Sequence, residues 1–205
     1  MTRLRCLGLC ACFVLSLTAM ACGSSNSGGS GPTTWDQARI ADTGFDWWLN
    51  FQKGAIYVSA DLTNTAGNSD SVMHTDVISF SQAVLAKYKS GAAPLSMVPT
   101  SGEVSGWTYD PGVAKSYPNP GVATDSTGAE NLIDGGAAAF FDSTKSYQAT
   151  GFAWENYINS TYKLELQVWQ MASAADATKV YLDLPTTSSL YSNATFTPCS
   201  AATCP

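Results

Sequence analysis

Residues 147–171, YQATGFAWENYINSTYKLELQVWQM, decide the fold. In the second half of this stretch, apolar side chains at positions 162, 164, 166 and 168 alternate with Lys163, Glu165 and Gln167. A period of two places the apolar residues on one face of a strand and the polar residues on the other. Because Ile158-Asn159-Ser160 separates the two apolar runs, the stretch predicts a β-hairpin.

A glycine pair lies just before the hairpin, in LIDGGAAAFF (Leu132–Phe141). Two adjacent glycines favour a tight turn, so we interpret Asp134, Gly135 and Gly136 as a structural turn. Asp134 can then cap a short helix that begins near Ala137. A nucleotide-binding loop is the alternative, but it needs a longer glycine pattern followed by Lys or Ser/Thr, which is absent here.

The N-terminal half repeats the strand signal and adds a helix. The runs FDWWLNF (Phe45–Phe51) and AIYVSADL (Ala55–Leu62) predict a second hairpin with a turn at residues 52–54. Val72–Lys89 predicts a helix that packs on the sheet, because its apolar side chains recur at steps of three and four. These are Met73, Val77, Phe80, Val84 and Tyr88.

The remaining segments complete a single domain from residue 35 to residue 205. Gly91–Ala129 is rich in Gly, Pro and Ser and predicts an ordered coil with one short strand, in which Trp107 is an anchor. Ser173 is placed to cap a helix that ends near Leu182, and one more strand is expected near Ala194–Phe196. The predicted class is α+β, an antiparallel sheet of hairpins covered on one face by two to three helices.

Residues 1–21 have the features of an export signal. Arg3 and Arg5 precede an apolar run, Cys6–Leu17, that is too short to span a bilayer permanently, and Ala19-Met20-Ala21 offers small residues at a cleavage site. Cleavage there would leave Cys22 at the start of the mature chain.

Cys22 and the Gly/Ser run after it resemble the lipobox of bacterial lipoproteins, in which the cysteine carries the lipid. The match departs from the family at Ala19, where leucine is commoner, and ordinary cleavage after Ala21 is the alternative. Residues 22–34 would then form a lipidated cysteine and a flexible linker. Gly23 in place of an aspartate resembles outer-membrane lipoproteins, so we expect a periplasmic or cell-surface location.

Two cysteines remain in the folded part, Cys199 and Cys204. In an oxidising compartment they predict one disulfide. A metal site or a redox pair is the alternative, but two sulfurs without nearby histidine lack the ligand count, and the spacing is not that of redox motifs.

Charge and motif content exclude several function classes. Without Arg3 and Arg5 the chain has 8 basic and 16 acidic residues, so a nucleic-acid partner is not expected. His74 is the single histidine, and the sequence contains no metal-ligand cluster, nucleophile elbow or phosphate-binding loop. We therefore expect no metal and no cofactor.

A carbohydrate site is the chemistry that these exclusions leave open. Trp47, Trp48 and Trp107 could stack on sugar rings, and Glu155 and Glu165 lie on neighbouring predicted strands, as a glycosidase pair would. Polar faces of antiparallel strands carry such carboxylates routinely, and an aromatic in a long loop usually anchors the loop to the core. A glycan site requires the tryptophans to be exposed together, whereas a non-catalytic domain without such a site predicts that they are mostly buried in the core.

LIDGGAAAFF, the hairpin and ASAADATKVY together resemble a family of exported bacterial proteins known only as a domain of unknown function. The residues that match its pattern are Trp107, Leu132–Ala137, Met171 and Ser173–Ala177. The resemblance implies no catalytic residues.

The first half of the chain resembles the same family out of order. Ala38–Asp42, the Trp47-Trp48 strand and the Tyr57 strand look like segments that usually follow the Ser-x-x-Asp-Ala helix. This order implies a circular permutation, which requires the domain ends, Thr34 and Thr197, to lie close together.

We expect a membrane-anchored lipoprotein with a non-catalytic binding or structural domain, whose partner is an envelope protein or a glycan. The alternative function is a glycan-binding or glycan-cleaving envelope domain.

Overall fold

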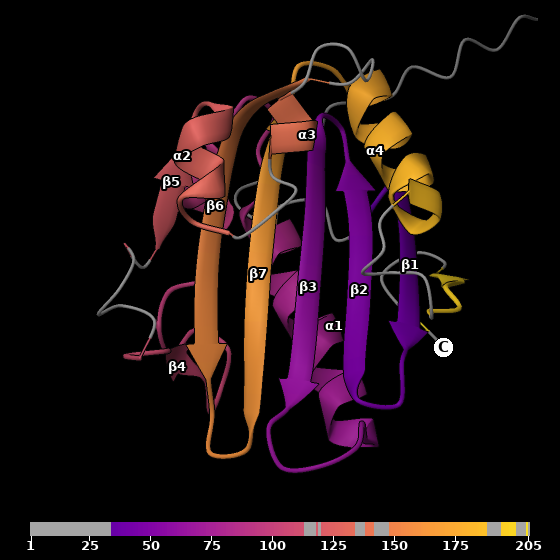
Figure 1. The fold of residues 1–205 in the computed structure, drawn as a ribbon, viewed down its shortest axis with the longest axis vertical. Coiled ribbons are helices and arrows are strands. Elements are labelled where there is room, and N and C mark those ends of the chain that lie inside the picture. Colours follow the sequence, from indigo (N-terminus) through magenta and orange to yellow (C-terminus); the bar gives the residue numbers. More distant parts are fainter. Residues whose placement is uncertain are drawn as a thin grey trace, which may run out of the picture.

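The computed structural model describes residues 34–112, 118, 120–133, 138–141, 148–187, 194–199 and 204. These residues form one antiparallel sheet of eight strands in the order β4-β6-β7-β3-β2-β1-β8, with β5 also paired to β6 (Figure 1). The predicted α+β class and single domain are confirmed for this part of the chain. The strands are β1 (Gln37–Asp42), β2 (Asp46–Lys53), β3 (Ile56–Asn64), β4 (Thr108–Tyr109), β5 (Gly121–Ala123), β6 (Ala149–Ile158), β7 (Tyr162–Met171) and β8 (Thr197–Cys199).

Both predicted hairpins are present. β6 and β7 pair around a turn in which Asn159 Oδ1 accepts hydrogen bonds from the backbone N–H groups of Thr161 and Tyr162. β2 and β3 pair around the turn at Gly54, which has a φ of 54°. β3 then pairs with β7, so the two hairpins lie side by side and form the centre of the sheet.

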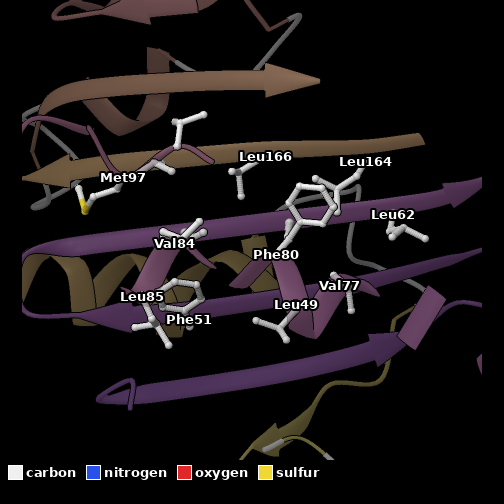
Figure 2. Close-up of a cluster of buried hydrophobic side chains, with 14 of the residues drawn as sticks. Leu49, Phe51, Leu62, Val77, Phe80, Val84, Leu85, Met97, Leu164 and Leu166 are labelled. Carbon is white, nitrogen blue, oxygen red and sulfur yellow. The ribbon is translucent and has the colours of Figure 1, made fainter. Parts of the chain in front are cut away.

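Helix α1 (Ser71–Lys87) covers one face of the sheet, which we call the α1 face. Asp70 caps the helix by accepting hydrogen bonds from the N–H groups of Val72 and Met73. Apolar side chains from the helix meet those of β2, β3 and β7, with Phe80 and Val84 among Leu49, Leu164 and Leu166 in Figure 2. The predicted apolar spacing of this helix is confirmed.

The opposite face is covered by helix α4 (Ala174–Thr187) and helix α3 (Ala138–Phe141), and we call it the α4 face. Here Trp169 stacks between Phe140 and Phe152, with ring centroids 4.0 Å apart in each pair. Figure 1 shows α1 behind the sheet and α4 in front of it. The expectation that the helices cover one face is therefore wrong, because side chains on both sides of the central strands are apolar and need cover.

The predicted coil contains more structure than expected. It forms a 3₁₀ turn, η1 (Pro94–Met97), the strands β4 and β5, and helix α2 (Ser126–Glu130). Trp107 is 2% exposed and packs edge-on against Phe80, with ring centroids 5.2 Å apart. Its predicted role as an anchor is confirmed.

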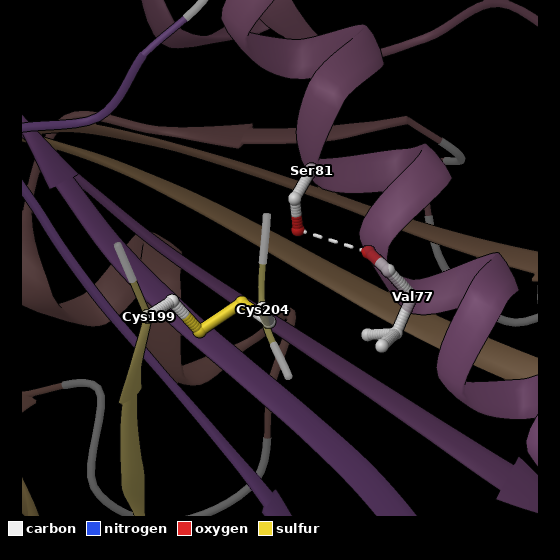
Figure 3. Close-up of a disulfide and its surroundings, with 4 residues drawn as sticks. All are labelled: Val77, Ser81, Cys199 and Cys204. Carbon is white, nitrogen blue, oxygen red and sulfur yellow. Dashed lines mark hydrogen bonds between the residues drawn. A yellow bond between two sulfur atoms is a disulfide. The ribbon is translucent and has the colours of Figure 1, made fainter. Parts of the chain in front are cut away.

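The two ends of the domain lie together. β1 pairs antiparallel with β8, so Ile40 faces Thr197 and Ala38 faces Cys199. This proximity is what a permutation requires, and the permutation itself stays a prediction. Cys199 and Cys204 form the predicted disulfide, with Cα atoms 4.5 Å apart, and the bridge packs against the α1 face (Figure 3).

Several predicted features lie outside the described residues: the export signal at residues 1–21, the lipidation site at Cys22 with most of the linker after it, and the turn formed by Asp134, Gly135 and Gly136. The short helix that this turn was expected to precede is α3. Helix α4 begins as predicted, because Ser173 Oγ accepts a hydrogen bond from the N–H of Asp176.

Candidate functional site

The five candidate ligand-contacting residues do not form one surface. Trp47 and Glu155 lie on the α1 face, where Trp107 is also buried, whereas Trp48 and Glu165 lie on the α4 face. The glycan alternative requires the tryptophans to be exposed together beside one groove, and this division does not meet that requirement.

Strand register separates the two glutamates. Glu155 is opposite Leu166, which belongs to the core under α1, whereas Glu165 is opposite Asn156 on the other face. Side chains of neighbouring residues in a strand point to opposite faces, so the two carboxylates have the sheet between them. A glycosidase needs both carboxylates on the same side of its substrate. Glu155 and Glu165 therefore cannot form that pair.

Glu155 is fully buried. One carboxylate oxygen, Oε1, accepts a hydrogen bond from the N–H of Asn156, and Oε2 has no hydrogen-bond partner among the described residues. Burial raises the pKa of the carboxyl to about 8, so the side chain is mostly protonated at neutral pH. We interpret it as a neutral core residue.

Polar side chains gather on the α4 face, in two rows that cross the central strands. The first row is Trp48, Asp61, Glu165 and Asn156, and the second is Arg39, Asn50, Ser59, Gln167 and Trp154. We call these nine residues the polar half of the α4 face. In Figure 1, α3 and α4 lie over the upper part of this face, and no labelled helix covers the lower parts of β2, β3 and β7.

The first row is partly open to solvent and carries an unusual carboxyl group. Trp48, Asp61, Glu165 and Asn156 are all intermediate in exposure. Burial is the main cause that raises the pKa of Asp61 to about 8, and the negative charges of Asp46 and Glu165 raise it further. Asp61 is therefore a hydrogen-bond donor at neutral pH.

Glu165 is held in place along its own strand. Its Oε1 accepts a hydrogen bond of 2.6 Å from Nε2 of Gln167, whose Oε1 accepts one of 3.1 Å from Nε1 of Trp169. This chain of hydrogen bonds orients Glu165 beside Asp61, its cross-strand neighbour on β3.

The second row contains two buried side chains with unfilled hydrogen-bonding capacity. Arg39 is 6% exposed, and among the described residues neither Nε nor Nη2 has a hydrogen-bond partner. Asn50, its cross-strand neighbour, is fully buried and has no partner for Oδ1 or Nδ2 in the same part of the structure. Buried polar groups are normally hydrogen-bonded, so this pair needs an explanation.

Aromatic rings hold the Arg39 guanidinium. Its Cζ lies 4.3 Å from the ring centroid of Tyr181 on α4 and 4.8 Å from that of Phe196, which precedes β8. Phe196 also lies 6.4 Å from the ring of Trp48. These rings contact the guanidinium and leave its N–H edge for another partner.

The sequence reasoning missed Arg39, Asn50 and Asp61. Each is a polar residue with an apolar residue on either side of it in the sequence, and such residues are usually placed on a solvated face. The sequence did contain one indication of this site: Arg39 is the single arginine after position 5, and it lies within the apolar run Ala38–Ala41.

One hollow lies away from this site, between η1, β5 and the ends of β6 and β7. Pro94, Leu95, Val122, Phe152 and Met171 are among its lining residues, none of which is titratable. It offers apolar contact without acid–base or charged groups.

Comparisons with known proteins give no further assignment: no protein-family model, curated protein or solved structure matches the chain. Among the described residues, no helix is both long and apolar enough to cross a membrane. The same part of the chain contains no group of three or more His, Cys, Asp or Glu side chains arranged to hold a metal ion.

Proposed function

We propose that this protein is an exported, lipid-anchored envelope protein whose domain binds a ligand on the polar half of the α4 face without transforming it. The export signal and Cys22 support the anchoring. The binding proposal depends on one observation, the partly exposed row of Trp48, Asp61, Glu165 and Asn156 across four adjacent strands.

The composition of this row suits a polar ligand. Trp48 offers a flat apolar surface, Asp61 offers a donor at neutral pH, and Glu165 offers acceptors. Rigid strands position all three, which reduces the entropy lost on binding.

A non-catalytic role is supported by the placement of the remaining chemical groups. His74 on α1 packs edge-on against Trp47, with ring centroids 4.6 Å apart, and Glu155 is buried on that same face. Neither lies on the face that carries Asp61 and Glu165.

The experiment compares two neighbouring tryptophans. The exported protein carrying Cys22→Ser, which removes the lipid acceptor, is titrated with neutral sugars, acidic sugars, amino acids and phosphate esters while thermal unfolding and tryptophan fluorescence are recorded. We expect one class to raise Tm, and Trp48→Ala to abolish the rise, because Trp48 lies on the binding face. Trp47→Ala is the matched control, since Trp47 lies on the other face.

The proposal predicts unequal effects from these two substitutions. If no class raises Tm, or if Trp47→Ala and Trp48→Ala weaken the response equally, ligand binding on this face is wrong.

A second candidate function, glycan cleavage, is favoured by the adjacency of Asp61 and Glu165. A carboxyl with a raised pKa beside a second carboxylate is the arrangement that glycosidases use for their acid and their nucleophile or base. The assay is reducing-sugar release from bacterial cell-wall glycan, with Asp61→Asn as the test and Glu155→Gln as the control on the other face. Release that Asp61→Asn abolishes would replace the non-catalytic proposal, and no release from the wild-type protein would remove this candidate.

The anchoring proposal has its own test. The wild-type protein should partition with membranes and the Cys22→Ser variant with the soluble envelope fraction. Equal partitioning of the two would contradict lipidation at Cys22.

A further inference from the structure

The unfilled hydrogen-bonding capacity of Arg39 is concentrated on one edge of its guanidinium. Nε and Nη2 lie on the same side of the group and form one of its two-pronged forks. This fork matches the two oxygens of a carboxylate or a phosphate. The rings of Tyr181 and Phe196 contact the guanidinium near Cζ and do not fill the fork.

Asn50 extends the fork with a second polar group. It lies directly opposite Arg39 in the register of β1 and β2, and its Nδ2 is a buried donor without a partner among the described residues. Two buried, unpartnered donor groups on neighbouring strands are costly to fold, because each is removed from water without compensation. A bound anion would satisfy both.

The charges around the pair agree with this interpretation. No ion pair to Arg39 occurs in the part of the chain that the structure describes. Asp61, two residues beyond Ser59 on the same face of β3, is the nearest acidic member of the polar half by register. A buried charge is normally paired with an opposite charge, and none of the described acidic side chains forms an ion pair with Arg39. The anionic group of a ligand could supply that opposite charge.

We propose that Arg39 and Asn50 form an anion-binding subsite for a carboxylate or phosphate group of the ligand. This inference rests on the proposed function, since the subsite adjoins the row that contains Trp48. The fork is buried and the rings of Tyr181 and Phe196 contact the guanidinium, so entry of an anion requires the side chains around Arg39 to move. Trp48 lies next to Phe196 and reports that movement.

The test uses simple anions at matched ionic strength. The Cys22→Ser protein is titrated with sodium acetate, inorganic phosphate or sodium chloride, and Tm and tryptophan fluorescence are measured, with Trp48→Phe identifying the contribution of Trp48. A matched series of glucose, glucuronate and glucose 6-phosphate then compares one sugar ring without an anion, with a carboxylate and with a phosphate. An anion at about 100 times its Kd should raise Tm by roughly 5 to 10 °C.

Three variants identify the residues responsible. Arg39→Met removes the charge at similar volume, Arg39→Lys keeps the charge without the fork, and Asn50→Leu removes the amide. We expect the first to abolish the rise in Tm and the other two to reduce it, with Lys53→Met, which leaves the subsite intact, as the control. If Arg39→Met does not fold, a smaller anion-induced rise in Tm in Asn50→Leu and Arg39→Lys still tests the subsite.

The outcomes separate this inference from the proposed function. A response to acetate and glucuronate assigns a carboxylate, and a response to phosphate and glucose 6-phosphate assigns a phosphate. Stabilisation no greater than that by chloride, or unchanged in Arg39→Met, overturns the subsite. If the rise in Tm caused by a neutral ligand still depends on Trp48, the proposed binding face stands even though the anion subsite is wrong. If anion binding depends on Arg39 and not on Trp48, the subsite stands and the larger binding face is wrong.

Discussion

The two faces of the sheet differ at their centres. On the α1 face, buried leucine, valine and phenylalanine side chains fill the space under the helix, and the buried polar side chains there include Glu155 and Ser81. On the α4 face, the same strands place Arg39, Asn50 and Asp61 in buried or partly buried positions with unfilled hydrogen-bonding capacity. Hydrophobic burial explains the residues found on the α1 face. The buried polar groups in the polar half of the α4 face lower stability, so their presence needs another reason. We propose ligand binding as that reason.

The largest effect on the free energy of unfolding should follow a substitution in the core of the α1 face. Phe80 is fully buried between Trp107 and Tyr157, with ring centroids 5.2 and 4.7 Å away. Phe80→Ala should lower the free energy of unfolding by about 3–5 kcal/mol in urea denaturation, through lost burial and the cavity left behind. Val72→Ala, at an exposed position on the same helix, should change it by less than about 0.5 kcal/mol. A loss below about 1.5 kcal/mol at Phe80 would contradict the close packing of this face.

The next effect is a dependence of stability on pH that both faces share. The pKa values of Glu155 and Asp61 are each raised to about 8 in the folded protein, so folding favours their protonated forms. The contribution of these protonated carboxyls to the free energy of unfolding is fully present near pH 4 and is lost as pH rises towards 8. Urea denaturation should show a fall of several kcal/mol between pH 5 and pH 8.

Single substitutions divide this effect between the faces. Glu155→Gln and Asp61→Asn should each remove roughly half of the fall. The pKa values of Asp36, Asp70 and Glu103 are lowered, so their contribution is lost below pH 4 and leaves this window unchanged. Burial raises the pKa of Asp76, which therefore adds to the fall in the same direction. Stability that rises between pH 5 and pH 8 would contradict the burial of both carboxyls.

A smaller effect concerns the disulfide, which holds the C-terminal end of the chain beside β1. The loop between Cys199 and Cys204 is short, so the bond should contribute ~2 kcal/mol on a chain-entropy argument. Reductant should lower the Tm of the wild-type protein by roughly 4–8 °C, and should leave the double Cys→Ser variant unchanged. A wild-type Tm that is indifferent to reductant would contradict this role.

The smallest effect is also the most specific to the α4 face. Asn50→Leu keeps the volume and removes two buried polar atoms without partners, so unfolding free energy should stay constant or rise by up to about 1 kcal/mol. Leu49→Asn, the neighbouring position on the α1 face, should cost more than about 2 kcal/mol. If Asn50→Leu destabilises as strongly as Leu49→Asn, the amide has a structural partner and the comparison between the faces fails.

Sequence patterns predicted the elements better than their arrangement. Alternation identified the β6–β7 hairpin, and steps of three and four identified α1, because both signals are local. The prediction placed helices on one face only. It missed that the apolar residues at even and odd positions of β6 point to opposite faces of the sheet, so both faces need cover. Phe152 and Trp154 face α4, whereas Ala153 and Tyr157 face α1.

The site was harder to predict because it depends on register. Glu155 and Glu165 occur on paired strands, and a register in which Glu165 is opposite Asn156 places them on different faces. Arg39 and Asn50 meet only when β1 pairs with β2, and the sequence patterns predicted no strand at the position of β1.

The most direct measurement of the central claim is an NMR titration of the Cys22→Ser protein with inorganic phosphate and with acetate. Arg39 is the single arginine after position 5, so its Nε–H gives one resolvable signal in the mature chain. The account predicts that one of these anions shifts this signal and the indole signal of Trp48, while the indole signal of Trp107 in the α1-face core stays in place. An Arg39 signal that neither anion moves, or a Trp107 signal that moves as far, would contradict ligand binding at the polar half of the α4 face.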